Sequence, residues 1–90
     1  MTCEVRVVFF AKARELVGTS ESRLTLPSQL SFAELKSALL EQFNDLEIIS
    51  QSFILAVNQE YVLEEETNVV LHSGDEVAVI PPISGGMFKI

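Results

Sequence analysis

The chain has 90 residues, of which 48% are hydrophobic and 21% charged, and its formal net charge is −7. This size and composition predict one folded domain with little room for an internal catalytic cavity. The acidic balance and the lack of a Lys/Arg cluster argue against nucleic acid as a partner. They suit a basic protein partner, or serve solubility alone. A single cysteine, Cys3, short apolar runs and an N-terminus without a signal-peptide pattern predict a cytoplasmic chain with no membrane partner.

The beginning of the sequence predicts two strands separated by a short helix. Residues 3–10 read as a strand in which alternate apolar residues face the core, and this alternation leaves Phe10 on the outer face. The short helix is expected over residues 11–17, where Gly18 stops it, and the second strand over residues 21–26.

The strongest local pattern predicts the main helix, beginning at Ser31. Ser31 and Glu34 have the spacing of a capping box, in which each side chain bonds the backbone N–H of the other residue. An apolar stripe follows at helical spacing: Phe32, Leu35, Leu39 and Phe43. Because no second long amphipathic helix is available, we expect this stripe to cover one face of a sheet.

The second half predicts further strands at residues 53–57, 60–62, 69–71 and 76–80, with a tight turn at Asn58-Gln59 and an acidic loop at residues 64–66. In the last strand, Val77 and Val79 face inward, and Ala78 and Ile80 face outward. This order of elements predicts an α+β fold of the β-grasp type, a mixed sheet of about five strands with one main helix packed on one face.

The residue types that build catalytic or metal sites do not form a set in this sequence. His72 is the only histidine, and neither a cysteine nor a second histidine lies near it. The acidic residues are scattered, and the four glycines cannot form a phosphate-binding loop. We therefore expect no bound metal, no bound cofactor and no catalysis by the chain alone.

The segment after the last predicted strand, Pro81-Pro82-Ile83-Ser84-Gly85-Gly86, has the properties of a peptide that is presented to another protein's active site. The two prolines favour an extended entry, and Ile83 can anchor in an apolar pocket. Ser84 is small, and the two glycines can thread a channel that any Cβ would obstruct. A frayed terminus with incidental glycines is the plain alternative.

Three blocks of the sequence resemble the small subunits of molybdopterin synthase (the MoaD type), which are ubiquitin-like β-grasp sulfur carriers, and the eukaryotic members most closely. The blocks are residues 8–18, 56–62 and 74–86; they follow the family's order and cover about a third of the chain. The last block is the most specific, because carriers of the thiamine pathway share the Gly-Gly end but lack the Pro-Pro-Ile-Ser lead-in.

The resemblance implies a sulfur-carrier domain over residues 1–86 that performs no catalysis itself. An activating enzyme is expected to use ATP to adenylate the carboxylate of Gly86, and sulfur transfer then produces a thiocarboxylate. Gly85 leaves room for the approach of the partner. Docking on the large catalytic subunit, in a heterotetramer of two small and two large subunits, gives the sulfur to a pyranopterin precursor in molybdenum cofactor biosynthesis.

Residues 87–90 depart from the family pattern, since a peptide bond at Gly86 leaves no carboxylate to activate. Three explanations stay open: a sequence error or recombinant addition, a natural extension that a protease removes, and loss of the carrier chemistry with the binding surface kept. Two other functions also stay open. One is a carrier for thiamine synthesis or tRNA thiolation, and the other is a non-conjugating β-grasp interaction module.

The partner-binding surface is predicted to centre on Phe10, Tyr61 and Ile80. Alternation places Phe10 and Ile80 on the outer faces of their strands. The first and last strands are neighbours in a β-grasp, so the two side chains are expected to form one exposed apolar patch, of the kind that marks partner sites. Ordinary scattered surface hydrophobes are the alternative.

Overall fold

The computed structural model describes residues 1–49, 53–62 and 68–81. The helical elements are α1 (Ala11–Val17), α2 (Phe32–Gln42) and the 3-10 helix η1 (Asn44–Ile49). The strands are β1 (Thr2–Phe9), β2 (Glu21–Pro27), β3 (Gln29–Ser31), β4 (Ile54–Val57), β5 (Glu60–Val62), β6 (Asn68–Val70) and β7 (Glu76–Ile80). No helix among these residues is long and apolar enough to span a bilayer.

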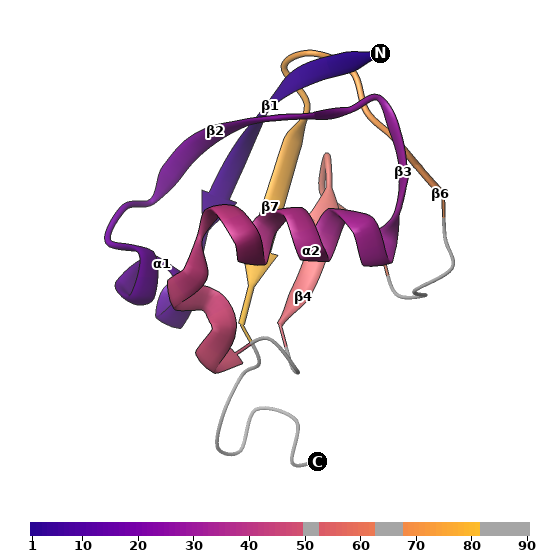
Figure 1. Cartoon of the computed structure of the whole chain (residues 1–90). Helices are drawn as coiled ribbons and strands as arrows, with labels where there is room; N and C mark the ends of the chain where they lie inside the picture. The colour runs from indigo at the N-terminus through magenta and orange to yellow at the C-terminus, as the bar shows by residue number, and fades with distance from the viewer. Residues whose placement is uncertain (50–52, 63–67, 82–90) are drawn as a thin grey trace, which may run out of the picture.

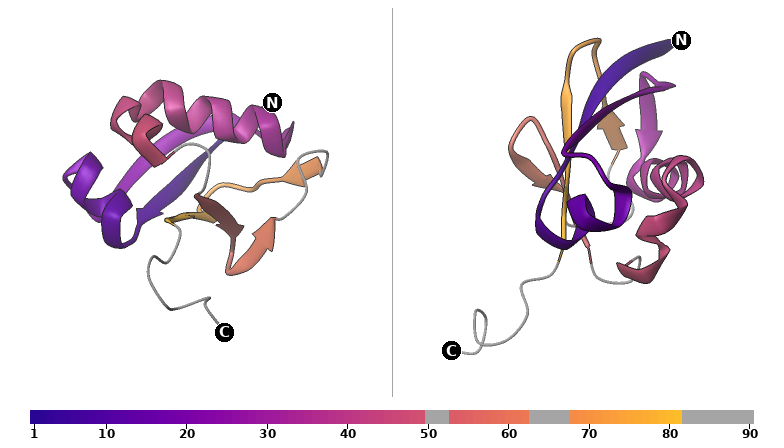
Figure 2. Two further views of the ribbon diagram at one scale, coloured as in Figure 1. Left: turned by 90° about the horizontal axis from the view of Figure 1, so that it is seen from below. Right: turned by 90° about the vertical axis from the view of Figure 1, so that its left-hand side faces the viewer.

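A five-stranded mixed sheet in the order β2-β1-β7-β4-β5 forms the centre of the fold (Figure 1). The first and last strands, β1 and β7, run parallel side by side, and the other pairs in the sheet are antiparallel. Helix α2 crosses one face of this sheet, as the side view in Figure 2 shows. The predicted α+β β-grasp, with one main helix on one face, is confirmed.

The core lies between α2 and the sheet. The predicted capping box starts the helix: Ser31 Oγ accepts from the Glu34 backbone N–H (3.1 Å), and Glu34 Oε1 accepts from the Ser31 backbone N–H (2.8 Å). Leu35 and Leu39 are fully buried, as the apolar stripe predicts. Phe43 follows the helix and meets Phe9 of β1 edge to face, with ring centroids 5.0 Å apart. The apolar face of the strands and the apolar stripe of α2 therefore pack against each other and form one core.

The predicted tight turn joins β4 to β5 and also ties this hairpin to β7. Asn58 and Gln59 both adopt positive φ (50° and 72°), the conformation of a two-residue turn that matches the twist of its strands. The Asn58 backbone N–H donates to the Glu76 carbonyl (2.8 Å), and Asn58 Oδ1 accepts from the Glu76 backbone N–H (3.0 Å). An asparagine suits this position because it tolerates left-handed backbone and can bond across.

The structure differs from the sequence-based prediction in several local details. The first strand ends at Phe9, and Phe10 is the N-cap of α1. Strand β3 and the helix η1 were not predicted, and the strand predicted at residues 69–71 lies at Asn68–Val70. It pairs with β3 in a separate two-stranded sheet, so its partner is set by tertiary contact and not by local pattern. The predicted loop at 64–66 lies outside the described residues.

Candidate functional site

The face of the main sheet opposite α2, here called the outer face, carries a continuous cross-strand row. Register places Val8 beside Ala78, Ala78 beside Ala56, and Ala56 beside Tyr61, across β1, β7, β4 and β5. Side chains of directly paired residues point to the same face of a sheet. The row is therefore apolar from β1 to β5.

A second apolar row lies next to the first, at the end of the sheet where β7 finishes. Ile80 pairs with Ile54, and Phe10 adjoins them because its backbone N–H donates to the Val79 carbonyl (3.2 Å). Phe10 has an extended backbone (φ −117°, ψ 150°), which continues the alternation of β1 beyond its last residue. We call the two rows together the apolar patch: Val8, Phe10, Ile54, Ala56, Tyr61, Ala78 and Ile80.

The predicted binding residues occupy the edges of this patch and not its centre. Phe10 is 47% exposed and Tyr61 is 65% exposed, whereas Ile80 is half-buried. Ala56 and Ala78 point outward by register, as predicted for Ala78, but both are buried. Their methyl groups are short, and larger side chains stand beside them in the ladder. The patch therefore combines two small buried residues with larger apolar side chains that are half-buried or exposed.

Sequence reasoning did not name Val8 or Ile54 as part of this surface. Both lie on the outer face of their strands and are half-buried. Alternation from the core residue Phe9 places Val8 outward, so a signal was present for this residue. For Ile54 the register against Ile80 is decisive, and a single sequence does not contain that information.

Pro81 closes the described part of the C-terminal region and is itself buried. A proline cannot donate a ladder hydrogen bond, which explains why β7 ends at the preceding Ile80. Because it is buried, Pro81 is packed against the rest of the domain. The other residues of the predicted tail, Pro82, Ile83, Ser84, Gly85 and Gly86, lie outside the described residues, as do residues 87–90.

The polar groups of the turn before β7 bond to one another. Asp75 Oδ2 accepts from the His72 backbone N–H (2.9 Å), and this bond holds the pKa of Asp75 below its ordinary value. The His72 side chain is exposed on the same turn, with Nδ1 3.7 Å from Asp75 Oδ2. Within the described ranges, His, Cys, Asp and Glu form no group of three that could hold a metal ion. Cys3 is buried in the core.

The described part of the chain is thus a β-grasp domain whose outer sheet face is apolar beside the end of β7. The model of the ThiS family matches residues 7–86, and the chain belongs to that family. The molybdopterin synthase sulfur carrier subunit of Drosophila ananassae is 44% identical over 82 residues, which span 91% of this chain and 90% of that protein. The Homo sapiens protein of the same name is 38% identical over 84 residues, 93% of this chain and 96% of that one.

Solved structures agree with the fold. Small archaeal modifier protein 1 from Methanosarcina acetivorans superposes with a TM-score of 0.72 at 25% identity, covering 96% of this chain and 99% of that one. A protein–protein complex of subunits 1 and 2 of the molybdopterin-converting factor from Helicobacter pylori contains a chain that matches with a TM-score of 0.63 at 22% identity, over 92% and 99%. The resemblance to molybdopterin synthase sulfur carrier subunits is therefore confirmed.

Proposed function

We propose that this chain carries sulfur as a thiocarboxylate on Gly86 and delivers it for the synthesis of the molybdenum cofactor. The observation that carries the proposal is the match to molybdopterin synthase sulfur carrier subunits over about nine-tenths of the chain. The family match also stops at residue 86, the second glycine of Gly85-Gly86. A carrier needs its reactive carboxylate at this position.

The chemistry requires an activating enzyme, because a free carboxylate is a poor acyl donor. An oxygen of the Gly86 carboxylate attacks the α-phosphorus of ATP, and pyrophosphate leaves. A sulfur nucleophile on the activating system then attacks the acyl carbon, and AMP leaves. When that nucleophile is a persulfide, the product is an acyl disulfide. A thiol of the activating system then attacks the donor's sulfur, so that a new disulfide forms on the activating system and the thiocarboxylate is released. The carrier itself binds no cofactor, since the partner enzyme binds ATP.

The proposal requires that residues 87–90 be absent from the working form. As long as Met87 is joined to Gly86, the carbonyl of Gly86 is part of an amide and has no free oxygen to adenylate. A protease that cleaves after Gly86 would convert the 90-residue chain into an active carrier.

Docking on the large subunit completes the function. The subunit 1–2 complex of the Helicobacter pylori protein supports a partner of this kind. We assign the docking role to the apolar patch, with Phe10, Tyr61 and Ile80 as the anchors predicted from the sequence. Ile80 of the patch is the last residue of β7, so a partner seated on the patch lies beside the point after which residues 82–86 follow in the sequence. The expected assembly is a cytoplasmic heterotetramer of two small and two large subunits.

The test is the intact mass of the protein purified from its native cells. The proposal expects a chain that ends at Gly86, with a fraction that is heavier by the exchange of one oxygen for sulfur. Deletion of the large subunit should increase this fraction, because the consumer of the thiocarboxylate is missing. A homogeneous chain that ends at Ile90 in all conditions would contradict the proposal and favour an interaction module. A thiocarboxylate whose level does not respond to the large subunit would favour a carrier of another pathway.

A further inference from the structure

The three predicted anchors of the apolar patch come from three different segments of the chain. Phe10 follows β1, Ile80 ends β7, and Tyr61 lies on β5, at the edge of the main sheet. The strands β1 and β7 have a neighbouring strand on each side in this sheet, whereas β5 pairs with β4 alone. The position of Tyr61 relative to the other two anchors therefore depends on how the β4–β5 hairpin is held.

The ladder of this hairpin holds Tyr61 only indirectly. Val57 and Glu60 flank the two-residue turn, and in such a hairpin the flanking residues form a hydrogen-bonded pair. Bonded and non-bonded pairs alternate along an antiparallel ladder, so Tyr61 and Ala56 form a non-bonded pair. The backbone N–H and carbonyl of Tyr61 therefore point away from β4, and the residue is 65% exposed. Its neighbours in the hairpin determine where its ring lies.

Asn58 attaches the hairpin to the start of β7 through its side chain as well as its backbone. Its backbone N–H donates to the Glu76 carbonyl (2.8 Å), and its Oδ1 accepts from the Glu76 backbone N–H (3.0 Å). The His72 backbone N–H is the main cause of the lowered pKa of Asp75, and a hydrogen bond from the Asn58 side chain adds to it. Because an amide has both an acceptor and donors, this one side chain bonds two consecutive residues.

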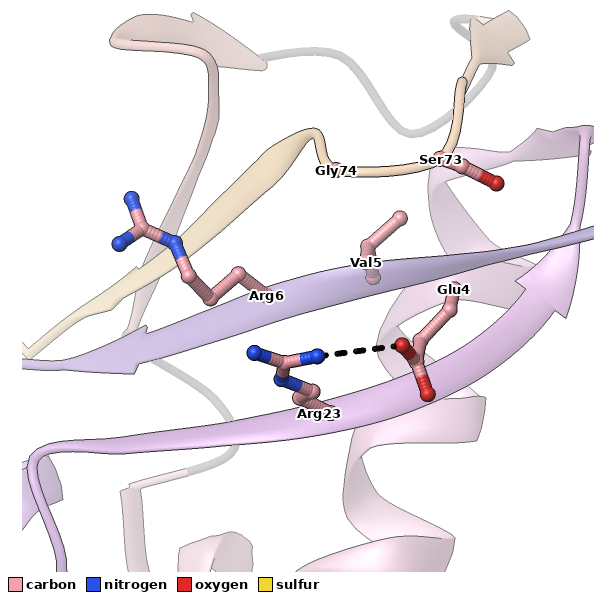
Figure 3. A pocket seen from close by; sticks show the side chains of 6 residues that line it. All are labelled: Glu4, Val5, Arg6, Arg23, Ser73 and Gly74. Carbon is pink, nitrogen blue, oxygen red and sulfur yellow. Dashed lines mark hydrogen bonds and ion pairs between the residues drawn. The ribbon is translucent and has the colours of Figure 1, made fainter.

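The segment that receives these bonds is itself fixed to β1. The Gly74 backbone N–H donates to the Glu4 carbonyl (2.9 Å), and the Arg6 backbone N–H donates to the Asp75 carbonyl (2.8 Å). The Arg6 guanidinium also pairs with the Glu76 carboxylate (2.8 Å). Figure 3 shows the turn alongside β1, at a cleft of about 230 Å³ whose lining includes the charged residues Glu4, Arg6 and Arg23. The hairpin is therefore joined to a point that several bonds hold in place.

We propose that Asn58 is a positioning residue for docking, whose side chain fixes the hairpin so that Tyr61 meets the large subunit together with the other two anchors. This inference rests on the proposed function and adds to it a residue outside the apolar patch. A partner that contacts three anchors at once binds best when their mutual positions are fixed beforehand, because ordering them on binding costs free energy. If the hairpin samples other positions, the apparent affinity falls with the fraction of molecules in the productive one.

Two glycine substitutions in the same turn separate this role from that of the turn itself. Asn58 and Gln59 both have positive φ, which glycine adopts freely, so either substitution is compatible with the turn. Asn58→Gly removes the side-chain bonds to Asp75 and Glu76. The Gln59 side chain makes no hydrogen bond to any residue that the structure describes, so Gln59→Gly is the matched control.

Calorimetric titration with the purified large subunit measures the effect. We expect Asn58→Gly to weaken binding by about fivefold and Gln59→Gly to change it by less than about twofold. Nuclear magnetic relaxation of the amides of residues 60–62 should report greater motion in Asn58→Gly alone. Unfolding midpoints identify any loss of fold, and the titrations are made well below the lowest midpoint, so that every variant is folded.

A Tyr61→Ala background distinguishes positioning of Tyr61 from a general effect on the domain. Tyr61→Ala alone should weaken binding by about tenfold, and adding Asn58→Gly should then cause no further loss. Equal affinities for Asn58→Gly and Gln59→Gly, or the same loss from Asn58→Gly with and without Tyr61, would overturn the inference while the proposed function stands. If well-folded wild type does not bind the large subunit, both fail.

Discussion

The backbone of Phe10 is hydrogen-bonded within the domain, whereas its side chain is partly exposed to solvent. Its N–H donates to the Val79 carbonyl, and its own carbonyl accepts from the N–H groups of Ala13 (3.0 Å) and Arg14 (3.4 Å). The next residue, Ala11, has a φ of 48°, a value that L-residues adopt at some cost in energy and that turns the chain sharply into α1. Phe10 is thereby fixed at a corner of the chain, where the residue is 47% exposed and can contact a partner.

Removing the ring should therefore affect binding more than folding. We expect Phe10→Ala and Ile80→Ala each to weaken binding to the large subunit by about tenfold, or roughly 1.4 kcal/mol, because each change removes apolar contact area from the interface. Calorimetric titration measures the affinity, and urea denaturation measures the unfolding free energy. Val70→Ala is the control, because Val70 is similarly exposed (53%) but lies on β6, outside the main sheet. Equal affinities for wild type, Phe10→Ala and Ile80→Ala would remove the docking role of the apolar patch.

At the scale of elements, the sequence predicts those features whose cause is local. The capping box at Ser31, the spacing of Leu35 and Leu39, and the turn at Asn58 depend on neighbours within a few residues, and all three are confirmed. Strand β3 has only three residues and exists through its pairing with β6, almost forty residues further along. A pairing of this kind leaves little periodic signal in either segment, which is why β3 was missed and β6 was misplaced by one residue.

The helix α2 should be the element on which the stability of the domain depends most. Leu39 is fully buried between α2 and the sheet, and Leu39→Ala should reduce the unfolding free energy by about 2–5 kcal/mol, through lost burial and the cavity left behind. That is a large share of the stability of a domain of this size. Ser37→Ala, an exposed position on the same helix, is the control and should shift it by less than about 0.5 kcal/mol. Similar unfolding midpoints for the two variants would contradict this account of the core.

At the scale of the whole molecule, the outer face is ordered along the strands. Charged residues around Arg23 lie at one end, the apolar patch follows, and β7 ends at Ile80 beside the patch. Strand alternation in the sequence predicted that Phe10 and Ile80 lie on the outer face, because it depends only on the neighbouring residues of each strand. The sequence could not predict the charged cleft, because Arg6 and Arg23 come together only through the register of β1 with β2.

The adenylation of Gly86 gives the last prediction, and it concerns the complete chain. A carboxylate oxygen must attack ATP, so only a chain that ends at Gly86 is a substrate for the activating enzyme. We expect the 90-residue form to be inert in an ATP–pyrophosphate exchange assay, and the form truncated after Gly86 to be active. In the truncated form, Gly86→Ala places a methyl group beside the reacting carbon. A displacement of about 1 Å there can cost roughly 100-fold in rate. We therefore expect the alanine variant to be slower by about that factor.

Each preparation in this assay must be checked by intact mass before and after the reaction, because cleavage after Gly86 would convert the long form into the short one. The apolar patch is identical in all three proteins, so differences among them report on the end of the chain and not on docking of the domain. Exchange by uncleaved 90-residue protein at the rate of the truncated form would show that Gly86 is not the residue adenylated. Inactivity of all three with an enzyme that activates a known carrier would show that the chain has lost the carrier chemistry.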